Sequence, residues 1–133
     1  MNGIPHAMDT RRAKYMPGQV WEYKTRLHEE ESTLTILKVW TTPDGLDAIH
    51  VAVNDLHITD LTGRTRGQEI THAPFTVEAL DRSVRELLHE SGPVPDSSEE
   101  YATWEAEEGG FFTGTVAQAI TELENAIRYA RPQ

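Results

Sequence analysis

The first half of the chain alternates apolar and polar residues, which predicts β-strands. From Trp21 to Leu27 the less polar side chains occupy every second position, as expected for a strand with one buried face. The polar run over residues 28–31 then predicts a charged turn exposed to solvent. The next strand, from Ser32 to Thr41, carries apolar residues on both faces, so we expect it to be covered on both sides, for instance by helices.

The clearest turn signal is Thr-Pro-Asp-Gly at residues 42–45, where proline pre-sets φ and glycine tolerates a positive φ. It predicts a hairpin that leads into a third strand over residues 47–58, with a bulge or a turn at Asn54-Asp55. A loop over residues 59–67 follows. Residues 68–72 predict a further edge strand, which we expect Pro74 to end.

The second half of the chain has the period of amphipathic helices. Residues 77–90 carry an apolar stripe with Thr76 as the predicted N-cap, and a Ser-Gly-Pro stop signal follows at residues 91–93. Capping boxes at Ser97 and Thr115 predict the start of two further helices, the second of which runs to about residue 130.

Strands followed by helices predict the α+β fold class. We expect an N-terminal antiparallel sheet of three to five strands, at about residues 18–72, packed against two or three C-terminal helices at about residues 76–130. Closure of the sheet toward a small barrel is an alternative. The 133 residues match the size of a single domain, which we place at residues 17–133 after a loose N-terminal arm, residues 1–16.

Composition removes several classes of chemistry. The chain has no cysteine, which excludes disulfides, thiolate zinc sites and cysteine nucleophiles. No apolar run approaches the ~20 residues of a membrane-spanning helix, and residues 1–14 lack the apolar core of a signal peptide, so we expect a cytoplasmic location. The P-loop and G-x-S-x-G motifs are absent, and no cofactor is predicted.

The net charge of −10 is concentrated in one segment. Residues 86–126, called here the acidic segment, contain ten acids and no lysine or arginine, whereas the charges of the remaining chain sum to zero. Such a field repels nucleic acid and anionic lipid and attracts basic partners, so we expect neither nucleic acid nor membrane to be bound directly. The alternative is a solvated face that only keeps the protein in solution.

An aromatic pair lies among the glutamates of the acidic segment. Aromatic residues with an acidic rim are typical of a hot spot for a basic partner, although packing of the helix onto the domain explains them equally well. The predicted partner-binding residues are Glu99, Glu100, Tyr101, Trp104, Glu105, Glu107 and Glu108.

The loop Gly63-Arg64-Thr65-Arg66-Gly67 is the most site-like loop. Its glycines allow close approach to a ligand, and Arg64 and Arg66 offer forked donors for phosphate or carboxylate. The alternatives are an ordinary exposed turn and a pairing of the arginines with acids of the same chain.

Six histidines invite a search for a metal site, but none has a partner two to four residues away, the close spacing that zinc ligands often show. His50 and His57 are seven residues apart, which places them on opposite faces of an unbroken strand. A bulge at Asn54-Asp55 would restore a common face. We predict no metal, and we note one histidine–acid grouping, His50 with Asp55 or Asp60.

Between residues 17 and 127 the chain contains PGQVWEYKTR, STLTILKV, HAPFTVEAL and a closing Y-x-x-W … GGFFTGTVAQAI. Together these stretches resemble a family of small bacterial proteins of uncharacterised function. The resemblance implies a bacterial source and one domain over most of the chain. It implies no activity, so no site residue is carried over.

These observations favour a binding protein over an enzyme. The first hypothesis is a non-enzymatic protein-binding module, such as an immunity protein or inhibitor, whose acidic helical half engages a basic partner. The second is a small enzyme or ligand-binding domain with a site on the sheet near His50, His57 and Arg64. The third is a structural subunit of a larger assembly, and the oligomeric state is left open.

Overall fold

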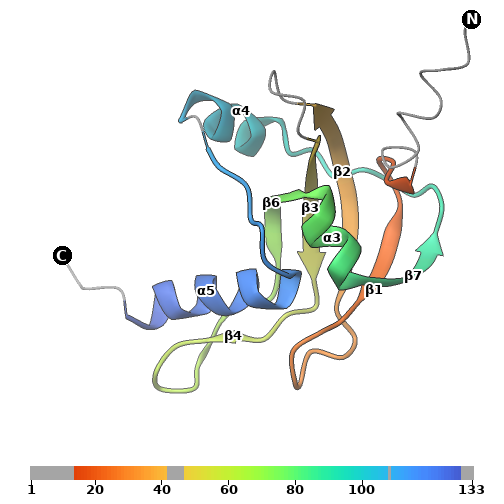
Figure 1. Cartoon of the computed structure of the whole chain (residues 1–133). Helices are drawn as coiled ribbons and strands as arrows, with labels where there is room; N and C mark the ends of the chain where they lie inside the picture. The colour runs from red at the N-terminus through yellow and green to blue at the C-terminus, as the bar shows by residue number, and fades with distance from the viewer. Residues whose placement is uncertain (1–13, 42–46, 108, 130–133) are drawn as a thin grey trace, which may run out of the picture.

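A five-stranded antiparallel sheet forms the centre of the protein (Figure 1). The computed structural model describes residues 14–41, 47–107 and 109–129. In spatial order the strands are β6 (Ile70–Thr76), β3 (Asp47–Asn54), β2 (Thr33–Thr41), β1 (Val20–Tyr23) and β7 (Val84–His89). A separate two-stranded sheet pairs β4 (Ile58–Thr59) with β5 (Thr65–Gly67). The α+β class is confirmed, and in the described residues the sheet stays open, with β6 and β7 at its edges.

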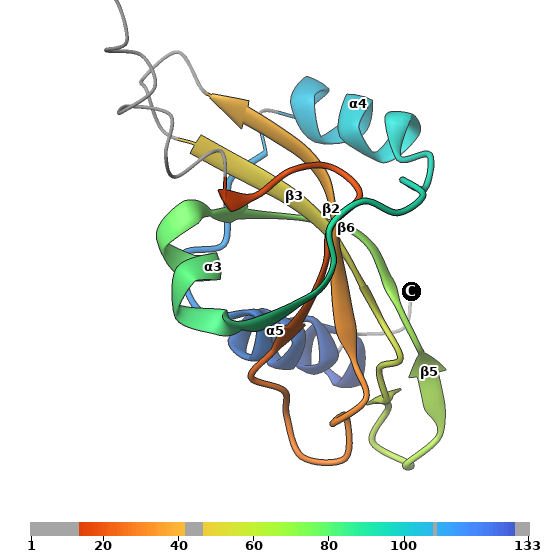
Figure 2. The same cartoon turned by 90° about the vertical axis from the view of Figure 1, so that its right-hand side faces the viewer.

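In the described residues, three helices cover the sheet: α3 (Val77–Ser83), α4 (Ser98–Ala106) and α5 (Val116–Arg128). Figure 2 shows α3 and α5 on one side of the strands and α4 on the other. On β2, Leu34, Ile36 and Leu37 are buried and Trp40 is half-buried against Trp104 of α4, whereas Lys38 is exposed. None of the helices in the described residues is long and apolar enough to cross a membrane.

The main core lies between the sheet and the α3–α5 layer. It contains the inward faces of β2 and β3, including Leu34, Ile36 and Val51, together with Leu80 from α3 and Ile120 from α5, all fully buried. Trp21 and Tyr23 join this core from β1, as their alternation predicts. Leu27 does not, because β1 ends at Tyr23, and its side chain is 82% exposed.

The helix predicted over residues 77–90 is half as long as expected. It ends at Ser83, and residues 84–89 form β7, which pairs antiparallel with β1. The apolar residues of β7 follow the helical spacing: Val84 and Leu87, three residues apart, both pack against the core, and Leu88 is 43% exposed. Strand pairing with the free edge of β1 overrides the helical pattern here, because it supplies the backbone hydrogen bonds that a helix would otherwise make.

Pro74 does not end the edge strand, contrary to the prediction. β6 continues to Thr76, with Pro74 opposite His50 of β3. Proline is tolerated because β6 is an edge strand and the missing N–H would point away from β3. On that outer side the Phe112 amide donates to the Pro74 carbonyl at 2.9 Å, and the Thr76 amide donates to the Phe112 carbonyl at 3.1 Å.

The two predicted capping boxes differ in outcome. At Thr115 the box is present: its hydroxyl accepts from the Gln118 amide at 3.2 Å, and the Gln118 side chain accepts from the Thr115 amide at 2.8 Å. At Ser97 the side chain makes no capping hydrogen bond. The carboxylate of Asp96 accepts from the Ser98 amide instead, so Asp96 caps the start of α4. The predicted turn at residues 42–45 lies outside the described residues.

Candidate functional site

Four described glutamates of the acidic segment lie on α4 or at its C-terminal end. Glu99 and Glu105 are exposed on this helix, Glu100 is half-buried, and Glu107 is exposed at its C-terminal end, whereas Glu108 lies outside the described residues. No residue of α4 is fully buried. Among the described residues no ion pair includes an acid of α4. These carboxylates therefore face solvent without a neutralising partner from the described part of the same chain.

Aromatic rings hold α4 against the sheet. The Trp104 ring meets Trp40 of β2 edge-on, with 5.7 Å between centroids, and it meets His50 of β3 in the same way at 4.8 Å. Tyr101 also contacts His50, at 5.1 Å, and Trp104 Nε1 donates to the Gly110 carbonyl at 3.0 Å. Packing of the helix thus accounts for both aromatic residues. Both remain half-buried, and a role of theirs in partner binding stays a prediction.

A shallow hollow of about 300 Å³ opens on the solvent side of α4, lined by Glu99, Glu100 and Thr103. Two carboxylates and a hydroxyl offer only hydrogen-bond acceptors plus one rotatable donor. Such a lining suits the head group of a lysine or an arginine, whose hydrogen bonds to carboxylates are about twice as strong as those between neutral groups.

Beneath α4, two histidines from neighbouring strands form a pair that sequence reasoning missed. His50 Nδ1 lies 2.7 Å from His72 Nε2, and the rings stack with 4.9 Å between centroids. The His50 side chain is 1% exposed, and its Nε2 has no hydrogen-bond partner among the described residues. Burial, and then the proximity of His72 and Lys38, lowers the pKa of His50 to about 4. Burial also lowers the pKa of His72, against an opposing effect of Glu100.

The turn at residues 28–31, predicted to be exposed, contains a buried carboxylate. Glu29 is 2% exposed and forms a forked ion pair with Arg26, with Oε1 2.8 Å from Nε and Oε2 2.7 Å from Nη2. The His57 amide donates to Glu29 Oε2 at 2.8 Å. Burial alone would raise the pKa of Glu29, but these hydrogen bonds hold the pKa below its ordinary value. The remaining glutamates of the turn are exposed.

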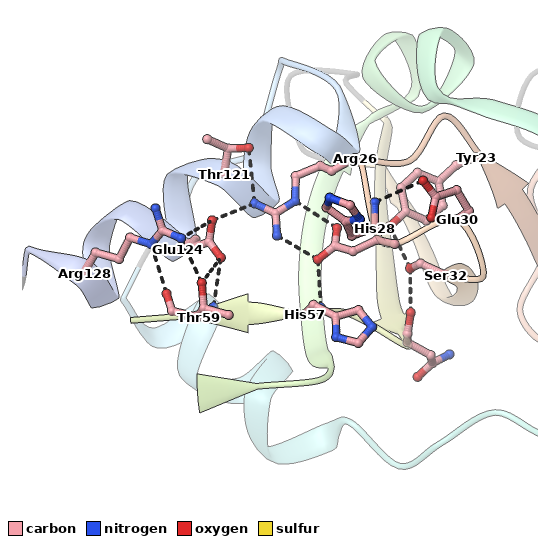
Figure 3. Close-up of polar contacts among 12 residues, drawn as sticks. Tyr23, Arg26, His28, Glu30, Ser32, His57, Thr59, Thr121, Glu124 and Arg128 are labelled. Carbon is pink, nitrogen blue, oxygen red and sulfur yellow. Dashed lines mark hydrogen bonds and ion pairs between the residues drawn. The ribbon is translucent and has the colours of Figure 1, made fainter. Parts of the chain in front are cut away.

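The Arg26–Glu29 pair continues into a network that reaches α5 (Figure 3). Arg26 Nη1 donates to Glu124 Oε1 at 3.0 Å, and Glu124 Oε2 accepts from the Thr59 amide at 2.9 Å. Arg128 donates to the Thr59 carbonyl at 3.1 Å and to its hydroxyl at 2.8 Å. The network therefore ties the β1–β2 loop and β4 to α5, and its carboxylates are fully engaged.

A pocket of about 290 Å³ lies beside this network. It is lined by His28, Glu29, Glu30, Glu31, Asp55, Leu56, His57 and Gln68. Two lining residues have the left-handed backbone conformation, His28 with φ 71° and Asp55 with φ 58°. Glycine is absent from both positions, so the surrounding hydrogen bonds hold these conformations against a local cost. Within the described residues no group of three or more side chains could hold a metal ion.

The remaining predicted site residues are not brought together. The Asp60 carboxylate accepts from the Arg64 amide at 3.1 Å and lies 3.9 Å from Arg66 Nε, so Arg66 is paired with an acid of its own hairpin. No hydrogen bond, ion pair or ring contact among the described residues joins His50 to His57, to Arg64 or to Asp60.

The chain matches no protein-family model, and comparisons with curated proteins and with solved structures give no match.

Proposed function

We propose that this protein is a non-enzymatic protein-binding module whose acidic α4 surface engages a basic partner. The observation that carries the proposal is the state of Glu99, Glu105 and Glu107, which are exposed and have no ion-pair partner among the described residues. Charges of one sign on one helix repel each other, and a basic partner relieves this repulsion on binding.

Two features of α4 support this use of the helix. Its aromatic residues Tyr101 and Trp104 are engaged with the sheet, while Glu99 and Glu105 are exposed to solvent. The hollow at Glu99, Glu100 and Thr103 offers a place for one basic side chain of the partner. Exposed charges of this kind chiefly raise the association rate at low salt rather than adding much affinity each.

The most concrete version is an immunity protein or inhibitor of a toxin or enzyme that acts on nucleic acid. Such a target needs a basic surface, because it binds a polyphosphate backbone through lysine and arginine. An acidic helix that occupies this surface competes directly with the nucleic acid. The proposal therefore names a class of partner by its charge, and it predicts inhibition that weakens as salt is added.

A pull-down from lysate at low salt and at about 0.5 M salt tests the proposal, with bound proteins identified by mass spectrometry. We expect one basic protein, held stoichiometrically and weakened by salt. The triple variant Glu99→Gln, Glu105→Gln and Glu107→Gln should then slow association with that protein by about tenfold or more at low salt.

The matched control carries the same charge change elsewhere. Glu31, Glu69 and Asp55 are exposed and lie outside the acidic segment, so their replacement by Gln, Gln and Asn gives a protein of equal net charge. Asparagine also tolerates the positive φ of Asp55. If the two triple variants associate equally fast, then only net charge matters and the α4 surface is not the binding site.

A second candidate function is the binding of a small ligand in the pocket between His28 and His57. The observation in its favour is the pair of left-handed residues, His28 and Asp55, in the lining of that pocket, because such backbone strain is often found at ligand sites. A thermal-shift screen with nucleotides, metals and small acids tests it. A ligand whose stabilisation is lost in His57→Gln would support this candidate.

A further inference from the structure

The contact between α4 and the sheet is built around a histidine pair. His50 is fully buried and lies between His72 of β6 on one side and the rings of Tyr101 and Trp104 of α4 on the other. No residue of α4 is fully buried, and the contacts of Tyr101 and Trp104 with His50 are part of the packing that holds this helix, together with the contact of Trp104 with Trp40. The state of the His50 ring therefore bears directly on whether α4 stays on the sheet.

The distance of 2.7 Å between His50 Nδ1 and His72 Nε2 restricts which ring nitrogens can be protonated. One of the two facing nitrogens, His50 Nδ1 or His72 Nε2, carries a hydrogen and the other accepts it. A neutral pair meets this condition in either tautomer. When both rings are protonated, two N–H groups face each other across the contact, and the hydrogen bond is lost.

A single added proton is also poorly accommodated. If His72 is protonated, it must donate to His50 Nδ1, and His50 must then carry its own hydrogen on Nε2. That nitrogen is buried and has no acceptor among the described residues. Within the described part of the chain this nitrogen lacks a partner in the neutral pair as well, but protonation adds a buried positive charge that exposure to water stabilises, so each proton favours opening of the contact.

The charged groups around the pair differ in their effect. Lys38 on β2 lies with its Nζ 3.8 Å from the centre of the Tyr101 ring, and its positive charge opposes protonation of His50. Glu100 on α4 favours protonation of His72 but does not form an ion pair with it in the described structure. The docked state thus binds protons less readily than separated, solvated histidines do.

We propose that the His50–His72 pair is a proton-controlled contact, which keeps α4 docked on the sheet when it is neutral and releases α4 when it is protonated. The inference rests on the proposed function for its biological meaning, because α4 carries the acidic surface. The docked, pre-organised form of that surface then prevails at neutral pH and is lost under mildly acidic conditions.

Native-state hydrogen exchange of the protein alone tests the release. Protection of residues 98–106, corrected for the intrinsic exchange rate, is compared at about pH 7.5 and pH 5. With a docked pKa of about 4 for His50 and an open value near 6.5, opening should increase roughly 25-fold over this range. Protection of α5 serves as the internal reference for global unfolding. Equal loss in both helices would overturn the proposal.

Two variants separate the histidine pair from general acid effects. His50→Phe keeps an aromatic ring against Trp104 but removes the titrating group, so the pH dependence of α4 protection should fall to within about twofold. His89→Gln removes an exposed histidine of β7 and should leave the wild-type behaviour unchanged. A pH dependence that persists in His50→Phe would contradict the proposal.

A measurement on the wild-type protein guards against a variant that does not fold. Nitrogen chemical shifts of the two imidazoles report their tautomers and pKa values directly. We expect the pKa of His50 well below the ordinary value of histidine, and a titration that coincides with loss of the Trp104 indole contact to Gly110. A His50 pKa at or above that ordinary value would overturn the proposal. None of these experiments includes a partner, so their failure leaves the charge-variant test of the proposed function intact.

Discussion

Arg26 and Glu29 form a forked ion pair across three residues of the β1–β2 loop, with both N–O distances below 2.9 Å. The Glu29 side chain is 1% exposed and that of Arg26 is 17% exposed, so the pair is largely removed from water. Through Glu124 the same guanidinium also reaches α5. The turn at residues 28–31, which the sequence predicts to be charged and exposed, therefore contributes a buried ion pair that links the β1–β2 loop to α5.

Loss of this tie should destabilise the protein. Glu29→Gln leaves Arg26 with one carboxylate and removes the charge-assisted acceptor of the His57 amide. Because Glu124 still partners Arg26, we expect a loss of about 2–3 kcal/mol in the free energy of unfolding, measured in urea at neutral pH. Glu31→Gln in the same turn is exposed and should change stability by less than about 0.5 kcal/mol. A similar effect from the two variants would contradict the assignment.

The free energy of unfolding should decrease as the pH is lowered from about 7 to about 4. In this range His50 is protonated in the unfolded state but neutral in the folded state. The pKa of His50 is about 4 when folded and near 6.5 when unfolded, so the unfolded state takes up the proton first. The free energy of unfolding is therefore independent of this group above about pH 7 and decreases as the pH falls toward 4. At pH 5 we expect the decrease to be about 2 kcal/mol relative to neutral pH. Unfolding curves for wild type and His50→Phe at several pH values measure it, and parallel profiles would refute it.

The two predicted capping boxes provide a matched comparison of helix starts. Thr115→Ala removes a hydroxyl that accepts from the Gln118 amide, so we expect a loss of about 1 kcal/mol. Ser97→Ala removes a hydroxyl that makes no capping hydrogen bond and should be nearly neutral. Thermal unfolding of the two variants measures the difference. An equal loss at Ser97 would show that its side chain caps α4 in solution.

The junction between α3 and α5 depends on one buried hydroxyl. Ser83 Oγ donates to the Ala79 carbonyl at 2.8 Å and accepts from the Val116 amide at 3.0 Å. Ser83→Ala leaves that amide buried and unpaired, which should cost about 1–2 kcal/mol in urea unfolding. Ser91→Ala changes an exposed serine and serves as the control. If Ser83→Ala is as stable as this control, the hydrogen bond contributes nothing measurable.

Local patterns in the sequence were sufficient for much of the fold. Alternation correctly predicts the buried face of β1, because a side-chain period of two is a property of every strand. The box at Thr115 is correct because its two hydrogen bonds involve residues only three positions apart. For the site, the positions of α4 and its glutamates follow from the same local signals, whereas their role in partner binding stays a prediction.

The tertiary structure decided the features that depend on distant partners. Residues 84–89 have the apolar spacing of a helix, and pairing with the free edge of β1 makes them a strand. Glu29 is buried where its carboxylate accepts hydrogen bonds from the Arg26 guanidinium and from the amide of His57, a residue 28 positions away. The His50–His72 contact joins residues 22 positions apart, and it depends on the pairing of β3 with β6, which places Pro74 opposite His50 and brings His72 to the same face; no local pattern encodes this pairing. Sequence alone thus determined the elements and the placement of charge, since both are local properties, while pairing across the sheet decided which polar groups are buried together.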